Sequence, residues 1–188
     1  MSSLSDAKMS SRFFSTIETI YNVFSSIVLK NKKYIENLTK NSRRNCLVDI
    51  NSTTSRNDYE NKDVNFIDSI FELETAPNIN FIDYLKRIIY YSKINYSTLI
   101  ISFILIDRFL NSKNYFLKSK NVYFVMAAGI IIASKFNDDK ILSDKDYSTV
   151  FMISSSRLHI LESLFLKDIN YDIFVNNKCY NEYINLLK

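Results

Sequence analysis

The sequence contains a single glycine and a single proline among its 188 residues. These two residue types together make up about 12% of an average protein, because tight turns need the backbone conformations that they favour. An all-β sandwich or barrel has many such turns, so we do not expect this chain to form one. One glycine is also too few for a phosphate-binding loop of the GxGxxG or Walker type. The expected fold class is therefore all-α.

Apolar residues are abundant enough for a sizeable core. Hydrophobic residues make up 47% of the chain and aromatic residues 14%, which argues against a disordered chain. The length fits one domain. The longest apolar runs, Leu99–Ile106 and Phe124–Ala133, are shorter than the ~20 residues that span a bilayer, and charged residues follow both. We therefore expect a soluble protein that makes no contact with a membrane.

Cysteine and histidine are too scarce for the common disulfide and metal frameworks. Cys46 and Cys179 do not form a disulfide framework and follow no secretory signal, so we expect an intracellular protein of the nucleus, the cytoplasm or both. His159 is the only histidine, and no familiar four-ligand zinc site fits. A Cys-His nucleophilic pair is formally possible, but no motif frames it. We expect no catalytic residue, no metal and no cofactor.

Three segments precede the main domain. Residues 1–12 are polar and rich in serine, and we expect a disordered tail. Over residues 13–39, apolar residues recur at steps of three and four, which predicts an N-terminal helical segment. Residues 40–62 are dense in Asn, Ser, Thr, Arg and Asp without a period, which predicts a flexible polar connection. A single compact domain is expected over residues 63–188.

A run of helices is predicted within this domain, because apolar residues follow a helical period and polar capping residues precede most of the segments. Two segments, 98–110 and 122–136, are apolar nearly all round, so other helices must surround them. Ala127, Ala128 and Gly129 are small enough to let a neighbouring helix approach closely. The predicted helices cover residues 63–73, 81–91, 98–110, 122–136, 147–152, 154–170 and 177–188.

A few charged residues lie on these otherwise apolar helices. Lys135 ends the most apolar segment, where a favourable interaction with the helix dipole is the simplest explanation. Glu162 lies in the middle of the predicted 154–170 helix, where a solvated polar face is the simplest explanation. Asp107 ends another apolar helix and needs a partner if it is buried, and Arg87 on the preceding helix is the nearest by topology. We expect a structural ion pair between Arg87 and Asp107.

Four short motifs follow one another in a characteristic order. Together they resemble a cyclin box, and they are most similar to the P-type (phosphate-pathway) cyclins. The resemblance covers about Asp63 to the C-terminus and implies a single five-helix cyclin box, here with additional N-terminal helices and a C-terminal helix. The motifs are PNINFIDYLKRI at Pro77–Ile88, LIDRFL at Leu105–Leu110, ASKF at Ala133–Phe136 with Asp138 and Asp139 after it, and LESLFL at Leu161–Leu166.

The resemblance also implies a function. Cyclin boxes bind and activate a cyclin-dependent serine/threonine kinase by pressing on its regulatory C-helix and activation segment, and they have no catalytic activity of their own. The kinase-contact lysine and glutamate of the family match Lys135 and Glu162. Phe136, Asp138 and Asp139 lie beside this site, and Asp139 is the candidate to meet kinase arginines. The implied assembly is a monomer in isolation and a heterodimer with the kinase.

Two features depart from other cyclins, and one alternative function stays open. Asn78 stands where mitotic cyclins carry the arginine of their substrate-docking patch, so we do not expect that docking mode. No second five-helix repeat is expected. The alternative is a cyclin-fold transcription or nucleic-acid-binding adaptor, for which the basic stretch at residues 30–44 is weak support. No aromatic platform interleaves that stretch, so we do not expect nucleic-acid binding.

Overall fold

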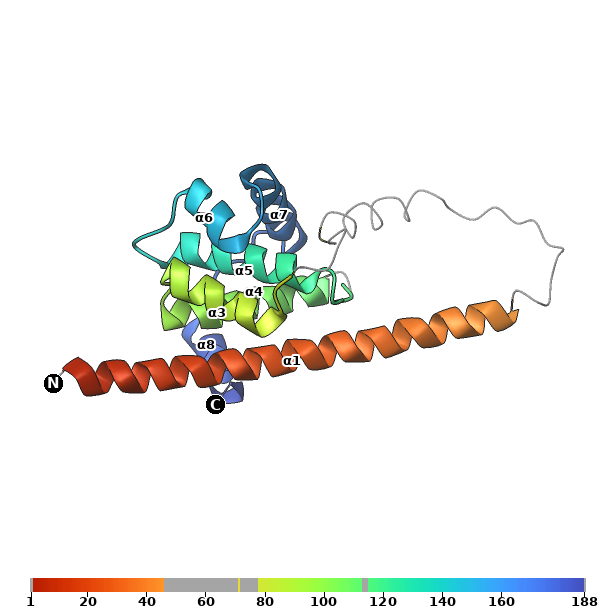
Figure 1. The fold of residues 1–188 in the computed structure, drawn as a ribbon, viewed down its shortest axis with the longest axis horizontal. Helices are drawn as coiled ribbons and strands as arrows, with labels where there is room; N and C mark the ends of the chain where they lie inside the picture. The colour runs from red at the N-terminus through yellow and green to blue at the C-terminus, as the bar shows by residue number, and fades with distance from the viewer. Residues whose placement is uncertain (1, 46–70, 72–77, 113–114, 188) are drawn as a thin grey trace.

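The structure, a computed structural model, describes residues 2–45, 71, 78–112 and 115–187 (Figure 1). These residues form seven helices and no strand, which confirms the expected all-α fold. Apart from Phe71, the helix expected over 63–73 lies outside the described residues. The helices are α1 (Ser2–Asn45), α3 (Phe81–Ser92), α4 (Tyr96–Ser112), α5 (Val122–Asn137), α6 (Asp144–Phe151), α7 (Ser155–Asp168) and α8 (Asn177–Leu186).

Helices α4 and α5 form the centre of the molecule. Every residue from Phe124 to Ser134 of α5 is buried, as expected for a helix that is apolar nearly all round. In Figure 1, α6 and α7 cover α5 on one side, and α1 and α8 lie on the other side of the central pair. Five helices, α3 to α7, therefore form the box, with α1 before it and α8 after it.

Gly129 marks the place where α4 and α5 approach most closely. A Cβ atom at this position would lie 2.5 Å from Ile106 Cγ1 and 3.4 Å from the backbone oxygen of Ser102. The first distance is shorter than van der Waals contact allows, so even an alanine here forces the neighbouring side chain to move. This close approach agrees with the expectation from the small residues of the segment.

We expect Gly129→Val to lower the free energy of unfolding by about 1–3 kcal/mol, because overpacking a core carries a cost of this size. Gly129→Ala should cost less, since alanine regains up to about 1 kcal/mol of helix propensity. Urea denaturation measures both changes. Ser163→Val, at an exposed position of α7, is the control. A Gly129→Val variant as stable as this control would contradict the close approach of α4 and α5.

The N-terminal helix α1 packs on the rest of the molecule through its middle, from Phe13 to Tyr34. Ile17, Ile20 and Phe24 are buried, and the ring centroid of Phe24 lies 5.4 Å from that of Phe103. The helix extends through residues 2–12 and 40–45, for which the sequence indicated a disordered tail and the start of a flexible connection. The helical backbone differs from that expectation because neither stretch contains a glycine or proline to end the helix.

Helix α6 begins three residues before the segment 147–152 that the sequence indicated. Ser143 is its N-cap, since Ser143 Oγ accepts a hydrogen bond from the Asp146 backbone nitrogen (3.2 Å) and donates one to Asp146 Oδ2 (2.6 Å). The earlier start places Asp144 in the first turn, where the helix dipole favours a carboxylate. Asp144 is thereby held at the edge of the α5–α7 contact.

Candidate functional site

Lys135 and Glu162 meet across the contact between α5 and α7. Lys135 Nζ donates hydrogen bonds to both carboxylate oxygens of Glu162, at 3.0 Å to Oε1 and 2.9 Å to Oε2. Their side chains are 32% and 16% exposed, so the pair lies at the rim of the packed helices and is partly removed from water. The fold thus brings together two residues that are 27 positions apart in the sequence.

Asp144 adds a second carboxylate to this pair. Asp144 Oδ1 lies 3.6 Å from Lys135 Nζ, and Asp144 Oδ2 lies 3.0 Å from His159 Nε2. The ammonium group of Lys135 also lies 5.8 Å from the ring centroid of Tyr147, within the range of a cation–π contact. The sequence interpretation missed Asp144 as a neighbour of Lys135 and His159 as a neighbour of Asp144. The Ser143 cap three residues before Asp146 was the available signal, because it sets the start of α6.

The cluster keeps Lys135 and Asp144 charged at neutral pH. Partial burial lowers the pKa of Lys135, but the hydrogen bond from Lys135 to Glu162 and the negative charges of Glu162 and Asp144 more than offset it, so the pKa lies above its ordinary value. The hydrogen bond with His159, followed by the positive charge of Lys135, holds the pKa of Asp144 below its ordinary value. Lys135 is therefore a cation held in place by acidic neighbours.

This arrangement suits contact with backbone groups of a partner. An ammonium group has three N–H donors, so Lys135 can hold Glu162 and still donate to another acceptor. The last four carbonyl groups of any helix lack intrahelical partners and are strong candidates for such an acceptor. Among the described residues, no group of three or more His, Cys, Asp or Glu side chains is placed to hold a metal ion. Within the same part of the chain, no helix is long and apolar enough to cross a bilayer.

The other residues predicted at this site lie at the C-terminal end of α5 and differ in their roles. Asp138 Oδ1 accepts hydrogen bonds from Thr98 Oγ1 (2.6 Å) and Asn95 Nδ2 (2.8 Å). Asp138 therefore ties the end of α5 to the start of α4. Phe136 is 53% exposed and Asp139 is exposed, so both are accessible to a partner.

The prediction of an ion pair between Arg87 and Asp107 is wrong. Arg87 Nε donates to the backbone oxygen of Val150, and Arg87 Nη2 donates to that of Thr149, both at 3.2 Å. Asp107 Oδ2 instead accepts a hydrogen bond from the Tyr183 hydroxyl at 2.6 Å. Arg87 thus joins α3 to α6, whereas Asp107 joins α4 to α8. Two charged residues on consecutive helices therefore need not be each other's partners.

We expect Asp107→Ala to lower the free energy of unfolding by only about 1–2 kcal/mol. Hydrogen bonds to charged groups contribute about 1.5–3 kcal/mol, and partial exposure of this site reduces that value. Tyr183→Phe removes the same hydrogen bond and should cost a similar amount, and the double variant should cost little more than either alone. Urea denaturation of the three variants tests this. A loss of about 3–5 kcal/mol for Asp107→Ala would instead indicate a buried ion pair.

Comparison with known proteins decides the family. The model of the Cyclin family matches residues 15–173, which is most of the chain. This chain belongs to the cyclin family. The match begins within α1, so the family region extends further toward the N-terminus than the motifs from Asp63 onward indicated.

Several plant and fungal cyclins are similar to this cyclin. Cyclin-U4-3 of Arabidopsis thaliana is 31% identical over 121 residues, which is 64% of this chain and 55% of the relative. Cyclin-P3-1 of Oryza sativa subsp. japonica is 25% identical over 115 residues, 61% of this chain and 49% of the relative. The PHO85 cyclin-like protein psl1 of Schizosaccharomyces pombe is 28% identical over 120 residues, which is 63% of this chain and 49% of the relative. This cyclin spans about half the length of these curated relatives.

Proposed function

We propose that this cyclin is a non-catalytic regulatory subunit that binds and activates a cyclin-dependent protein kinase. The observation that carries the proposal is the bidentate contact between Lys135 and Glu162, the two residues that match the kinase-contact pair of the family. The name of one relative, a PHO85 cyclin-like protein, agrees with a kinase as the partner. In this proposal the cyclin is a monomer in isolation and forms a heterodimer with the kinase.

The proposed contact joins the Lys135 cluster to a helix of the kinase. Lys135 donates to carbonyl groups at the end of the kinase regulatory helix, while Glu162 orients the ammonium group or accepts from partner backbone. The exposed ring of Phe136 supplies apolar contact area next to this polar anchor. A regulatory helix held in one orientation is the physical basis of activation.

Two acidic residues have separate parts in the proposed contact. Asp139 is exposed and is available to pair with arginines beside the activation segment of the kinase. Asp138 is engaged with Thr98 and Asn95, so it acts by holding the end of α5 in place. Asp139→Asn should therefore weaken activation without changing stability.

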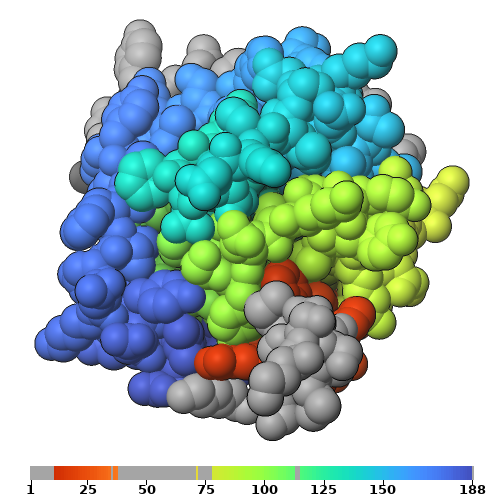
Figure 2. Space-filling view, turned by 90° about the vertical axis from the view of Figure 1, so that its left-hand side faces the viewer, coloured from red at the N-terminus to blue at the C-terminus, as the bar shows by residue number. Residues whose placement is uncertain are grey.

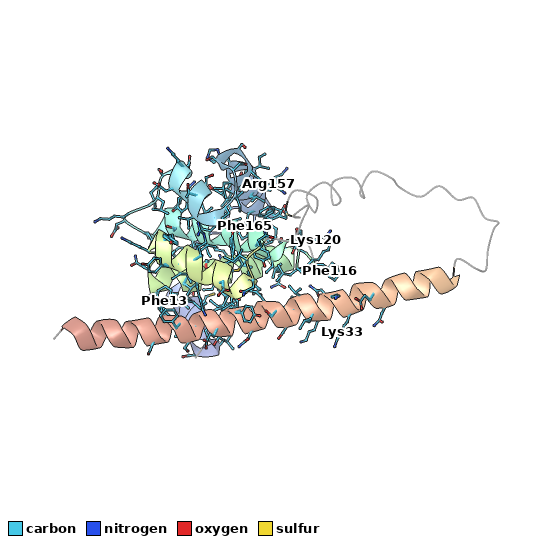
Figure 3. The ribbon with its side chains drawn as sticks, viewed as in Figure 1. Phe13, Lys33, Phe116, Lys120, Arg157 and Phe165 are labelled. Carbon is cyan, nitrogen blue, oxygen red and sulfur yellow. The ribbon has the colours of Figure 1, made fainter. Side chains whose placement is uncertain are left out.

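Affinity capture of the kinase tests the proposal. The tagged full chain is incubated with lysate of its source, and retained proteins are identified by mass spectrometry. We expect a protein kinase to be retained by the wild-type chain and by Lys120→Ala, in which an exposed turn residue away from the cluster is changed (Figure 3). Lys135→Ala should lose that kinase. Absence of any kinase, or equal retention by Lys135→Ala, would contradict the proposal.

A further inference from the structure

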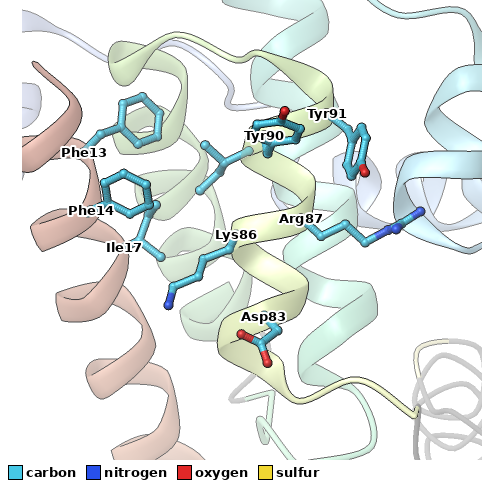
Figure 4. A pocket seen from close by; sticks show the side chains of 9 residues that line it. Phe13, Phe14, Ile17, Asp83, Lys86, Arg87, Tyr90 and Tyr91 are labelled. Atoms are coloured by element: carbon cyan, nitrogen blue, oxygen red, sulfur yellow. The ribbon is translucent and has the colours of Figure 1, made fainter. Parts of the chain in front are cut away.

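A groove lies between α1 and the exposed face of α3, away from the Lys135 cluster. Its volume is about 430 Å³, within the range of about 300–1,000 Å³ that is usual for ligand sites. Figure 4 shows Phe13, Phe14 and Ile17 of α1 on one side and Lys86 and Tyr90 of α3 on the other. The groove shares no residue with the contact between α5 and α7.

Aromatic rings in this groove are exposed to an unusual degree. Tyr90 is 75% exposed, Tyr91 is 54% exposed and Phe14 is 52% exposed. The rings of Tyr90 and Tyr91 contact each other with centroids 5.0 Å apart, so they present one joined aromatic surface. Large apolar patches are rare on monomeric proteins and mark interaction sites, and tyrosine is enriched at the energetic centres of such sites.

The α3 residues that line the groove come from a single side of that helix. In Figure 2, α3 and α4 lie beside α5 and α8 on one face of the molecule, although α3 and α8 are far apart in the sequence. Residues 83, 86, 87, 90 and 91 follow the helical repeat, so they lie on one side of α3. The groove is thus a continuous surface built by one helix face and one wall from α1.

The charges of the groove favour an acidic partner. Lys86 is exposed, and among the described residues it has no ion-pair partner. The Arg87 side chain extends away from α1 (Figure 4), donates to two backbone carbonyl groups of α6 and lies 5.2 Å from the ring centroid of Tyr91, so its charge lies at the far edge of the groove. Asp83 is the only acidic residue in the lining, and its carboxylate accepts a hydrogen bond from Asn80 Nδ2 at 2.7 Å. Lys86 is therefore the cation of the lining that extends toward α1, and its charge is available to a carboxylate of a partner.

We propose that this groove binds a short segment of a partner protein in which apolar side chains alternate with acidic ones. The apolar side chains pack against Phe14 and Tyr90, and the carboxylates face Lys86. The volume of the groove fits a few side chains, which is the size of a short recognition segment and too small for a folded domain. The proposal goes beyond kinase regulation and does not depend on Lys135.

Selection from a random library of 12-residue peptides tests the proposal on the full chain. We expect enriched peptides to combine one or two Leu, Ile or Phe residues with Asp or Glu nearby. The best peptide, labelled with fluorescein, should bind Tyr90→Ala and Lys86→Glu at least tenfold more weakly than it binds the wild-type chain. Raising the salt concentration should weaken its binding to the wild-type chain.

Matched variants keep the test specific to the groove. Phe174→Ala removes an aromatic ring of similar exposure elsewhere, and Lys120→Glu makes the same charge change on a distant turn. Both should bind the peptide as the wild-type chain does, and thermal melts check that all four variants fold. Enrichment of basic peptides, no enrichment, or binding that Tyr90→Ala and Lys86→Glu leave unchanged would overturn the proposal.

Discussion

Phe165→Ala should lower the free energy of unfolding by about 3–5 kcal/mol, the largest change in stability that we expect for a single substitution. Phe165 is fully buried on α7 (Figure 3), and its ring stacks on that of Phe109 with centroids 4.5 Å apart and planes at 5°. The ring of Phe109 lies in turn 5.2 Å from that of Phe71. Removing Phe165 therefore opens a cavity within a connected aromatic core. Since domains are stable by about 5–15 kcal/mol, this loss is a large fraction of the free energy of unfolding.

Urea denaturation measures this change, and a residue of the same helix provides the control. Ile160 lies on α7 but is 48% exposed, so Ile160→Ala removes an apolar side chain without leaving a cavity. We expect Ile160→Ala to stay within about 0.5 kcal/mol of the wild-type chain. Equal losses for the two variants would show that Phe165 is not part of the core.

Lys135→Ala should weaken binding to the kinase by roughly 30- to 5000-fold. Truncating one partner of a charge-assisted contact in an interface costs about 2–5 kcal/mol, and each 1.4 kcal/mol is about a factor of ten in affinity. Glu162→Ala should weaken binding by a similar factor, because it frees the ammonium group that it holds with two hydrogen bonds. Both side chains lie at the rim of the helices, so neither variant should unfold.

A double variant shows whether Glu162 acts by holding Lys135 or whether the two residues contact the kinase independently. If Glu162 acts by holding Lys135, then the combined Lys135→Ala and Glu162→Ala variant should bind no more weakly than Lys135→Ala alone. Titration calorimetry with the purified kinase measures the three affinities. Lys120→Ala should bind as the wild-type chain does. Losses that add in the double variant would contradict the positioning role of Glu162.

The helical fold of residues 78–187 was largely predictable because local signals agree with the packing. Asn80 accepts a hydrogen bond from the backbone nitrogen of Asp83 and begins α3 as its residue type suggests. The apolar residues of α5 continue without interruption, so this helix had to be surrounded by others. Gly129 lies where α5 comes closest to α4, as the small residues of the segment indicated. Periodicity and capping depend on neighbours in sequence, so the sequence carries them directly.

Side-chain pairing between helices was less predictable. Arg87 reaches backbone oxygens on α6, and Asp107 reaches Tyr183 on α8. Both choices depend on the rotation of each helix about its own axis, which the order of helices leaves undetermined. Of the two carboxylates beside Lys135, one was predicted and the other was not. The resemblance to cyclins indicated Glu162, whereas Asp144 is specified only once the start of α6 is known.

The measurement that tests the central claim most directly is the rate at which the purified kinase partner phosphorylates a generic substrate. The rate is followed as the wild-type chain, Lys120→Ala or Lys135→Ala is added in increasing amounts. We predict activation by the first two with the same half-saturating concentration, and none by Lys135→Ala at concentrations that saturate the wild-type response. Activation by a folded Lys135→Ala chain with the wild-type half-saturating concentration would contradict the assignment of the Lys135–Glu162 pair as the kinase contact.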